Sequence, residues 1–337
     1  MSRTLVVGIT LGLAGAALLG ASLLLGTSGL APGRAFEALV AGPGGPDPTA
    51  RAIVWDLRLP RALLAFSVGG GLAVAGVAMQ ALVRNPLAEP YLLGVSSGAS
   101  AGASLFYLGF LPPLLSKALS LPLAAFLGAM GAIAVVFAVA RAGGRLSTAR
   151  LLLAGVAVSS LLAGATAFVT FASPEPNKLR AVLFWLLGSL GGARWATVAL
   201  PLAAAALGTA VLWVLARPLD ALLTGEEPAR SLGIPVERLK RWVIALAAAV
   251  TGVLVAAAGV IGFVGLIVPH AVRFVVGAGH RRVVPLAFVV GGLFLLGADV
   301  GARAVLPGQE LPVGVVTAAC GVPFFLVLLR RTDRLPL

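Results

Sequence analysis

The feature that most constrains this chain of 337 residues is a series of long apolar segments separated by short polar ones. Most of these segments run for about 18–25 residues, the length that an α-helix needs to cross a hydrocarbon core of about 30 Å. They predict an all-α, polytopic membrane protein with about ten transmembrane helices. The segments lie at 4–26, 60–82, 91–110, 119–140, 150–172, 196–216, 242–262, 263–277, 284–304 and 312–330.

Composition supports a membrane protein over a soluble one. Hydrophobic residues make up 59% of the chain and charged residues only 11%, whereas soluble domains carry about 25% charged residues. A single soluble core does not grow large enough to bury this much apolar surface. We expect residues 1–337 to form one transmembrane domain, with a break near Gly259, Gly262 and Gly265 separating the seventh and eighth segments.

The net charge of +13 does not indicate a nucleic-acid-binding protein, because the cations lie singly or in short clusters between apolar segments. With the N-terminus in the cytoplasm, 16 of the 25 Lys and Arg residues fall on the cytoplasmic side. The positive-inside rule therefore predicts that both termini are cytoplasmic. A cleaved signal peptide is the alternative for the first segment. The other nine cations are Arg34, Arg51, Arg58, Arg61, Lys117, Lys178, Arg180, Arg194 and Arg303.

Two polar loops stand out. The outer loop 27–59 is rich in Gly and Pro and is expected to be irregular. The inner loop 217–241 is predicted to form two short helices on the cytoplasmic surface. Thr224 and Glu227 have the spacing of a capping box, Gly233 would end the first helix, and Pro235 would begin the next.

The sequence contains no site for ATP or for a metal ion. A P-loop needs the sequence Gly-Lys-Ser/Thr, and none of the lysines (Lys117, Lys178 and Lys240) follows a glycine. If transport uses ATP, hydrolysis must occur on another polypeptide, and loop 217–241 is then either a docking surface for that polypeptide or a plain connecting loop. His270 and His280 are ten residues apart, and Cys320 is the only cysteine, so no metal-ligand spacing is present.

Three sets of residues have both a functional and a structural interpretation. Asp299 is either the carboxylate of an ion-coupled carrier or a hydrogen-bonded structural group. Small residues in the fifth segment, at the spacing of Gly155, Ser159 and Ala163, either pack closely on a neighbouring helix or line a wide solute path. The third set is either a group of generic surface cations or an exposed basic set for an acidic protein. Its members are Arg58, Arg61 and Arg303.

Several long strings in this chain resemble the FecCD-type permeases, the membrane subunits of ABC importers for iron siderophores, haem and cobalamin. The resemblance runs from about Leu57 to the C-terminal segment. Its strings are LRLPRALLAFSVGGGLAVAGVAMQALVRNPLAEPYLLGVSSGASAG, RLSTARLLLAGVAVSS, GEEPARSLGIP, GVIGFVGLIVPHAVRF and ELPVGVVTAACGVPFFLVLL.

The resemblance implies a type II ABC importer permease in a bacterial inner membrane. It implies a homodimer whose path along the dimer axis is lined by the fifth and tenth helices, here the strips Gly155–Thr166 and Val313–Phe325. The residues it assigns to the path or gate are Ser147, Thr148, Gly155, Ser159, Ser160 and Ala163.

The resemblance also implies the partners. Arg58, Arg61 and Arg303 would dock carboxylates of a periplasmic or lipid-anchored binding protein. No cofactor is expected on this chain, since ATP and Mg²⁺ would bind the partner ATPase dimer. The ATPase contacts would be Glu227, Ala229, Arg230, Leu232 and Gly233.

The function expected from the sequence is therefore inward translocation of a metal chelate, with no covalent step on this chain. The strings do not distinguish a siderophore from haem or cobalamin. Two other classes stay open, namely an ion-coupled secondary transporter built around Asp299 and a membrane scaffold without transport.

Overall fold

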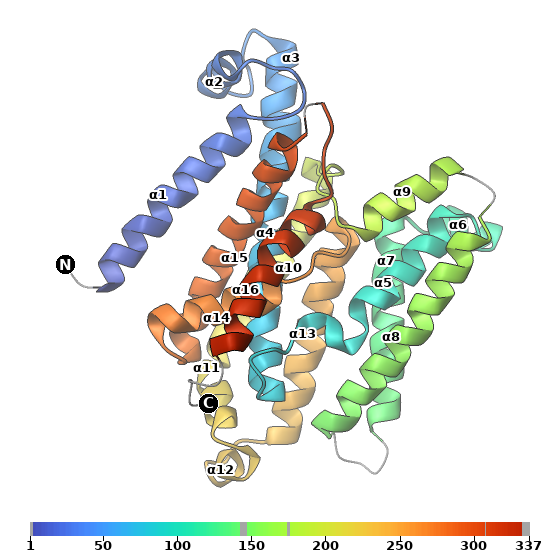
Figure 1. Ribbon diagram of the computed structural model, residues 1–337, viewed down its shortest axis with the longest axis vertical. Helices are drawn as coiled ribbons and strands as arrows, with labels where there is room; N and C mark the ends of the chain where they lie inside the picture. Colours follow the sequence, from blue (N-terminus) through green and yellow to red (C-terminus); the bar gives the residue numbers. More distant parts are fainter. Residues whose placement is uncertain (1–2, 142–146, 174–175, 307, 332–337) are drawn as a thin grey trace.

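The structure is a computed structural model that describes residues 3–141, 147–173, 176–306 and 308–331. These residues form helices and connecting turns, with no strand among them. The helices make an elongated bundle (Figure 1). We call the end that carries α2 (Pro32–Ala41) the upper end, and the end that carries α12 (Glu226–Ser231) the lower end.

Seven of the described helical segments are long and apolar enough to cross a membrane. They form because each places an uninterrupted apolar sequence in the only backbone conformation that satisfies its own hydrogen bonds in lipid. The seven contain α1 (Arg3–Leu24), α4 (Leu59–Val83), α7 (Leu121–Ala140), α8 (Thr148–Phe171), α10 (Trp195–Val214), α13 (Val236–Ala258) and α15 (His280–Ala304).

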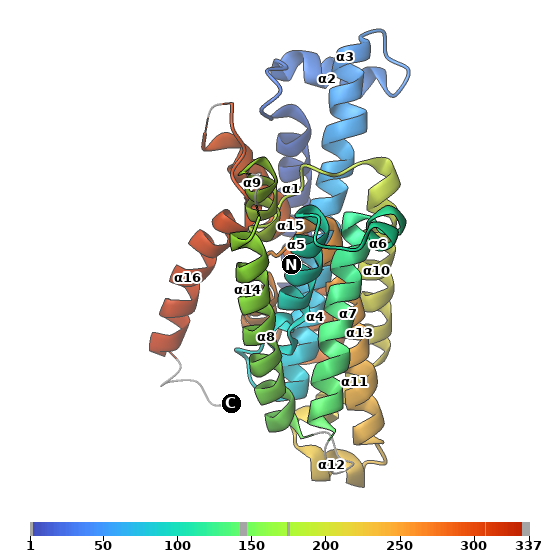
Figure 2. The same ribbon diagram turned by 90° about the vertical axis from the view of Figure 1, so that its right-hand side faces the viewer.

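Three further helices complete the set of ten expected from the sequence. Two of them, α5 (Val95–Tyr107) and α14 (Val264–Val276), have only 13 residues each. At 1.5 Å per residue each spans about 20 Å, which is less than the hydrocarbon core. The third is α16 (Val313–Arg331), which diverges to one side of the bundle in Figure 2.

The prediction of an irregular outer loop 27–59 is largely wrong. Within it, α2 is helical, and a second helical run continues from α3 (Pro48–Arg51) through the π-helical segment η1 (Ala52–Arg58) into α4. This run begins at Asp47, whose carboxylate accepts hydrogen bonds from the backbone N–H groups of Thr49 and Ala50 at 3.1 and 3.0 Å. Capping by Asp47, with proline at the first helical position, explains why the helix starts there.

The remaining short helices lie at the two ends. The upper end carries α6 (Pro113–Ala118) and α9 (Pro176–Leu186), and the lower end carries α11 (Ala216–Leu223) and α12. A single 3₁₀ turn, η2 (Pro90–Leu93), precedes α5.

Helix α4 is the central helix, and it is buried along most of its length. It packs against α10, α13, α14 and α15. The contact with α14 depends on glycine, because a Cβ atom at Gly76 would lie 2.0 Å from the carbonyl oxygen of Gly265. Close backbone approach through small residues is how helices pack where lipid supplies no hydrophobic driving force.

The break predicted between the seventh and eighth segments is confirmed. Helix α13 ends at Ala258 and α14 begins at Val264, with Gly259 and Phe263 both in the left-handed region at φ 70°. Two side chains from the loop before α5 bond to this break. The N–H of Phe263 donates to Glu89 Oε1 at 2.9 Å, and the Tyr91 hydroxyl donates to the carbonyl of Ile261 at 2.9 Å.

The same break bonds to the turn after α9, and that turn bonds to the start of α16. The N–H of Ser189 donates to the carbonyl of Ala258 at 2.8 Å, and the N–H of Val313 donates to the carbonyl of Gly188 at 3.0 Å. We call residues 185–189, 258–263 and 313–314 the crossing region. Because non-helical backbone inside a membrane protein needs internal partners, this region ties α9, α13, α14 and α16 together.

Candidate functional surfaces

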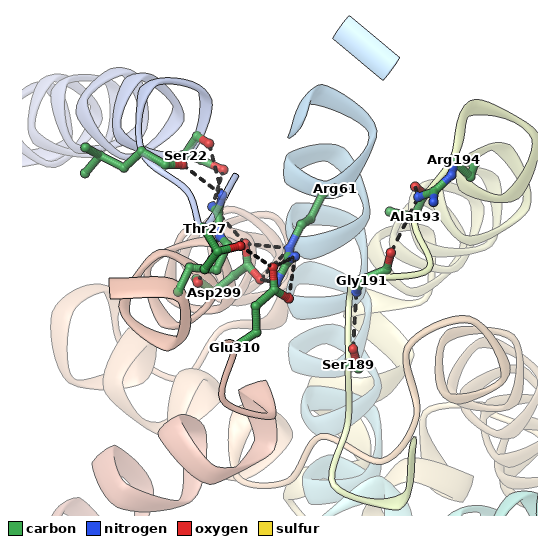
Figure 3. A network of polar contacts seen from close by, with 11 residues as sticks. Ser22, Thr27, Arg61, Ser189, Gly191, Ala193, Arg194, Asp299 and Glu310 are labelled. Atoms are coloured by element: carbon green, nitrogen blue, oxygen red, sulfur yellow. Dashed lines mark hydrogen bonds and ion pairs between the residues drawn. The ribbon is translucent and has the colours of Figure 1, made fainter. Parts of the chain in front are cut away.

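A cluster of charged side chains lies near the upper end, where α4 and α15 meet the loop before α16. We call Arg58, Arg61, Asp299, Arg303 and Glu310 the upper ionic cluster. Arg61 lies between the two carboxylates, as Figure 3 shows. Its Nη2 is 2.9 Å from Asp299 Oδ1, and its Nη1 is 2.8 Å from Glu310 Oε2. Such forked contacts are the strong form of an arginine–carboxylate pair.

The other two arginines of the cluster are held by α1 and the turn after it. Arg303 Nη2 lies 3.0 Å from Asp299 Oδ2 and 3.0 Å from the Ser22 hydroxyl. Arg58 Nη1 donates to the carbonyl of Leu23 at 2.7 Å. Arg58 and Arg303 are both buried, so these bonds compensate for the loss of water around their charges.

The expectation of an exposed basic set is therefore wrong, because its three arginines are largely buried. They are Arg58, Arg61 and Arg303. Their relative exposures are 4% for Arg58, 8% for Arg303 and, for the Arg61 side chain, 13%. The physical reason is that segments distant in sequence, α1 and the loop carrying Glu310, fold over them. Nothing in the local spacing of these arginines predicts that cover.

A small cavity of about 250 Å³ remains beside the cluster. Its lining includes all three arginines of the cluster together with Arg194 and Glu310. Arg194 is exposed and donates to backbone carbonyls of its own turn. No local pattern in the sequence marks Arg194 or Glu310 as part of a site, although Glu310 begins the string ELPVG. The cavity is thus more cationic than anionic.

Asp299 has partners on two sides. The side chain is fully buried, and it contacts Arg61 and Arg303 at 2.9 and 3.0 Å. Intramembrane carboxylates commonly pair with cations in this way. This arrangement matches the structural interpretation of Asp299, and no feature of its surroundings specifically favours ion coupling.

At the lower end, loop 217–241 contains two short helices, α11 and α12, but with bounds that differ from the predicted ones, because the helix expected from Pro235 is the start of the long α13. The predicted capping box is wrong, because Thr224 ends α11 and donates its hydroxyl to the carbonyl of Ala221 at 2.8 Å. Gly225, with φ 123°, is the N-cap of α12 instead. Gly233, with φ 79°, follows α12, and Pro235 is the N-cap of α13.

The five residues predicted to contact an ATPase differ in exposure. Leu232 is 71% exposed, and Glu227 and Gly233 are also on the surface. The side chain of Ala229 is fully buried against Leu222 and Val236, and its contact with an ATPase stays a prediction. Ala229 packs α12 onto α11 and α13. The last of the five, Arg230, is paired with Glu227 and lies 3.5 Å from Glu226.

An ion pair that the sequence analysis missed joins α12 to α13. Glu226 bonds to Lys240, whose side chain is almost fully buried. Burial alone would raise the pKa of Glu226, but the hydrogen bond and charge of Lys240, with Arg230 and Arg84, hold the pKa below its ordinary value. The acidic GEE sequence was the only local sign of this contact.

The predicted path residues on α8 do not share one environment. Gly155 is buried, and a Cβ atom there would lie 2.1 Å from the carbonyl oxygen of Leu92, so this position serves helix packing. Ser159 is half-buried beside Gly94, whereas Ser160 and Ala163 are exposed. Ser147 is exposed at the start of α8, and Thr148 is half-buried. The strip thus divides into a packing side and an exposed side.

Comparison with known proteins identifies the family. Residues 14–331 match the FecCD transport family. The chain belongs to the FecCD transport family.

Several FecCD relatives carry names from import systems. The chain is 45% identical over 292 residues to a cobalamin import system permease protein of Halobacterium salinarum, covering 85% of this chain and 75% of that protein. It is 44% identical over 282 residues to a hemin transport system permease protein of Yersinia pestis, and the match covers 82% of this chain and 83% of that protein. It is 41% identical to a vitamin B12 import system permease protein of Vibrio cholerae, covering 92% and 89%.

A solved structure agrees with this FecCD assignment. It is described as an inward-facing conformation of a metal-chelate type ABC transporter, and it superimposes with a TM-score of 0.82 at 31% identity. The alignment covers 96% of this chain and 98% of the other. The chain is therefore a membrane-embedded transport permease of the ABC-importer class, as the sequence strings predict.

Proposed function

We propose that this FecCD permease carries a large metal chelate into the cytoplasm as one half of a homodimer driven by a separate ATPase dimer. The observation that carries this proposal is similarity over 82% or more of the chain to import permeases for cobalamin and hemin. Iron siderophores are the third chelate class implied by the sequence strings.

The two ends of the bundle suggest a direction of transport, from the upper end to the lower end. The lower end offers α12, a short helix with an exposed leucine and a buried ion pair to α13, which suits an ATPase that must move a membrane helix. The upper end offers the cationic cavity beside Arg194, which suits carboxylates of a periplasmic or lipid-anchored binding protein. In this proposal the lower end and both termini are cytoplasmic.

The path would run along the face where α8 exposes small residues. Ser160 and Ala163 are exposed there, and α16 exposes Val315, Val322 and Leu326. Exposed faces of this kind would be covered or would line a passage when two copies meet. The solute would cross by alternating access, with no covalent step on this chain. ATP with Mg²⁺ would bind the partner subunits.

Uptake by proteoliposomes tests the proposal. The chain, its ATPase and its binding protein are reconstituted, and radiolabelled cobalamin, hemin and a ferric siderophore are offered separately. We expect ATP-dependent uptake of one of the three that survives collapse of ion gradients by ionophores. Uptake that needs a gradient and no ATP would support the ion-coupled alternative, and absence of both ATPase association and uptake would support a scaffold.

A further inference from the structure

A second and larger cavity lies between α7, α9, α10 and α13, and it borders the upper ionic cluster only at Glu310. Its volume is about 1190 Å³, which is somewhat above the range of about 300–1,000 Å³ that is usual for ligand pockets. We call it the upper recess. Most of its wall is apolar and aromatic, and includes Leu123 and Phe126 of α7, Phe184 of α9, Leu200 of α10 and Val253 of α13.

The upper recess lies at the depth of one lipid leaflet. It reaches down α10 from Ala196 to Pro201, and α10 begins at Trp195. Six residues of helix span about 9 Å, which is less than half of a hydrocarbon core of about 30 Å. Tryptophans at helix ends mark the membrane–water interface, so Trp195 places the top of the recess there.

The recess opens to the surroundings of the bundle. Leu200 is 66% exposed although it lines the recess, and Leu123 is also exposed. Helix α10 lies on the opposite side of the bundle from α16 in Figure 2. This wall therefore faces lipid, whereas the proposed solute path follows α8 and α16.

One cation lines the upper recess without a bonding partner among the described residues. Arg180 of α9 is exposed, and it shares a helix face with Asn177, which also lines the recess. The arginines of the upper ionic cluster, in contrast, are all bonded. Glu310 reaches the recess from its other side, but its carboxylate is held by Arg61.

We propose that the upper recess binds one glycerophospholipid of this leaflet, with an acyl chain in the apolar cavity and its phosphate on Arg180. A guanidinium forms forked, charge-assisted hydrogen bonds with phosphate, and the Asn177 amide offers a further donor. The acyl chain fills space under α9, the helix that connects α8 to α10. The lipid thereby supports α9. Binding of the lipid requires neither the ATPase nor the binding protein.

Native mass spectrometry of the purified full-length chain tests the inference. The protein is delipidated in detergent, and phosphatidylglycerol is added back as the probe. We expect one tightly retained lipid per chain. Arg180→Ala should weaken retention roughly tenfold or more, since a hydrogen bond to a charged group contributes about 1.5–3 kcal/mol. Lys117→Ala removes an exposed upper-end cation that does not line the recess, and should retain lipid normally.

A filling variant tests the cavity independently of charge. Ala196→Trp places an indole in the recess and should displace the lipid with Arg180 intact. Ala199→Trp, on an exposed position of α10 outside the recess, is the matched control. Circular dichroism and gel filtration confirm that each variant is folded.

Three outcomes would overturn the inference. Unchanged retention in both Arg180→Ala and Ala196→Trp would show that the lipid binds elsewhere. Equal retention of diacylglycerol, or displacement by inorganic phosphate alone, would show that the phosphate and acyl chain are not recognised together. Hemin or cobalamin binding that Ala196→Trp abolishes, with no lipid retained, would assign the recess to the transported solute.

Discussion

At the scale of single residues, the ion pairs around Asp299 determine the stability of the upper end. Its carboxylate lies between Arg61 and Arg303, and Glu310 completes the pairing of Arg61. A buried ion pair of this kind adds little stability compared with packed apolar side chains. Removal of one partner, however, leaves a buried charge uncompensated and lowers stability. The cluster therefore makes the junction of α1, α4 and α15 sensitive to single substitutions.

Asp299→Asn should lower the free energy of unfolding by about 3–5 kcal/mol, because two largely buried guanidinium groups lose a shared carboxylate. Unfolding of the purified protein by SDS titration measures the change. Asp56→Asn, at an exposed position two residues before Arg58, is the control and should change stability by less than about 0.5 kcal/mol. Similar stability of the two variants would contradict the assigned role.

Gly259 is the residue on which the crossing region most depends. Its φ is 70°, and a Cβ atom would lie 2.1 Å from the carbonyl oxygen of Trp185. Gly259→Ala should destabilise the protein by about 2 kcal/mol or more in the same titration. Gly262→Ala, three residues later in an open position, should have a much smaller effect. Equal effects would show that backbone approach at Gly259 is unimportant.

At the scale of elements, α12 is held on the lower surface by apolar packing and by ion pairs to α13, including Arg230 with Glu237 at 3.7 Å. Ala229 packs against Leu222 and Val236, and Glu226 bonds to Lys240 of α13. These contacts leave Leu232 exposed at the end of the helix. An ATPase bound there would transmit displacement directly into α13.

Leu232→Asp should weaken association with the ATPase by about tenfold or more, since an exposed apolar anchor is replaced by a charge. Co-purification and binding assays in detergent measure this association. Leu114→Asp makes the same change at a highly exposed position of α6, at the upper end, and should leave ATPase binding unaffected. Normal ATPase binding by Leu232→Asp would place the contact elsewhere.

The joint between α12 and α13 should depend on pH. Because Lys240, Arg230 and Arg84 hold the pKa of Glu226 below its ordinary value of 4.5, the carboxylate stabilises the joint above that pH. This stabilisation is lost as the pH falls through the lowered pKa. Hydrogen exchange of α12, corrected for intrinsic rates, should show protected amides from pH 5 to 8. This range lies above about 4.5, and the protection should decrease at lower pH.

Glu226→Gln provides the control for this pH dependence. The variant lacks the titrating carboxylate, so its α12 should exchange faster at neutral pH and show no separate loss of protection in acid. A wild-type acid transition that persists in Glu226→Gln would assign the effect to another carboxyl group.

At the scale of the whole molecule, the upper and lower ends differ in the partners that they can bind. The cationic cavity is at the upper end, and the α12 surface is at the lower end. Between the two ends, α9, α13, α14 and α16 are joined at the crossing region, so a displacement of α13 would reach the other three helices there. A single orientation in the membrane is required for this arrangement to import a solute.

Cysteine labelling tests that orientation. In a Cys320→Ala background, Ser116→Cys reports on the upper end and Ser231→Cys on the lower end, and both positions are exposed. In right-side-out vesicles, a membrane-impermeant maleimide should label Ser116→Cys at once and Ser231→Cys only after permeabilisation. The reverse pattern would place α12 outside the cytoplasm and contradict the proposed direction of transport.

The sequence by itself determined the class and the helices. Runs of about 18–25 apolar residues cross a bilayer in one conformation, so seven spans, the break at Gly259 and the short helices of loop 217–241 follow from local chemistry. The strings of the FecCD family likewise identify the transport class, because they are properties of contiguous sequence. Local signals misled the prediction in loop 27–59, where an Asp47 cap starts a helix, and at Thr224, where Gly225 is the N-cap instead.

Tertiary structure alone decided which of the predicted residues are accessible. Arg61 meets Asp299 across 238 positions of sequence, and Thr27 meets Glu310 across 283. Burial of Arg58 and Gly155 likewise depends on neighbours that no local pattern specifies. Exposure is a property of packing between distant segments, and so the docking, coupling and path surfaces, and the upper recess, emerge only once the helices are assembled.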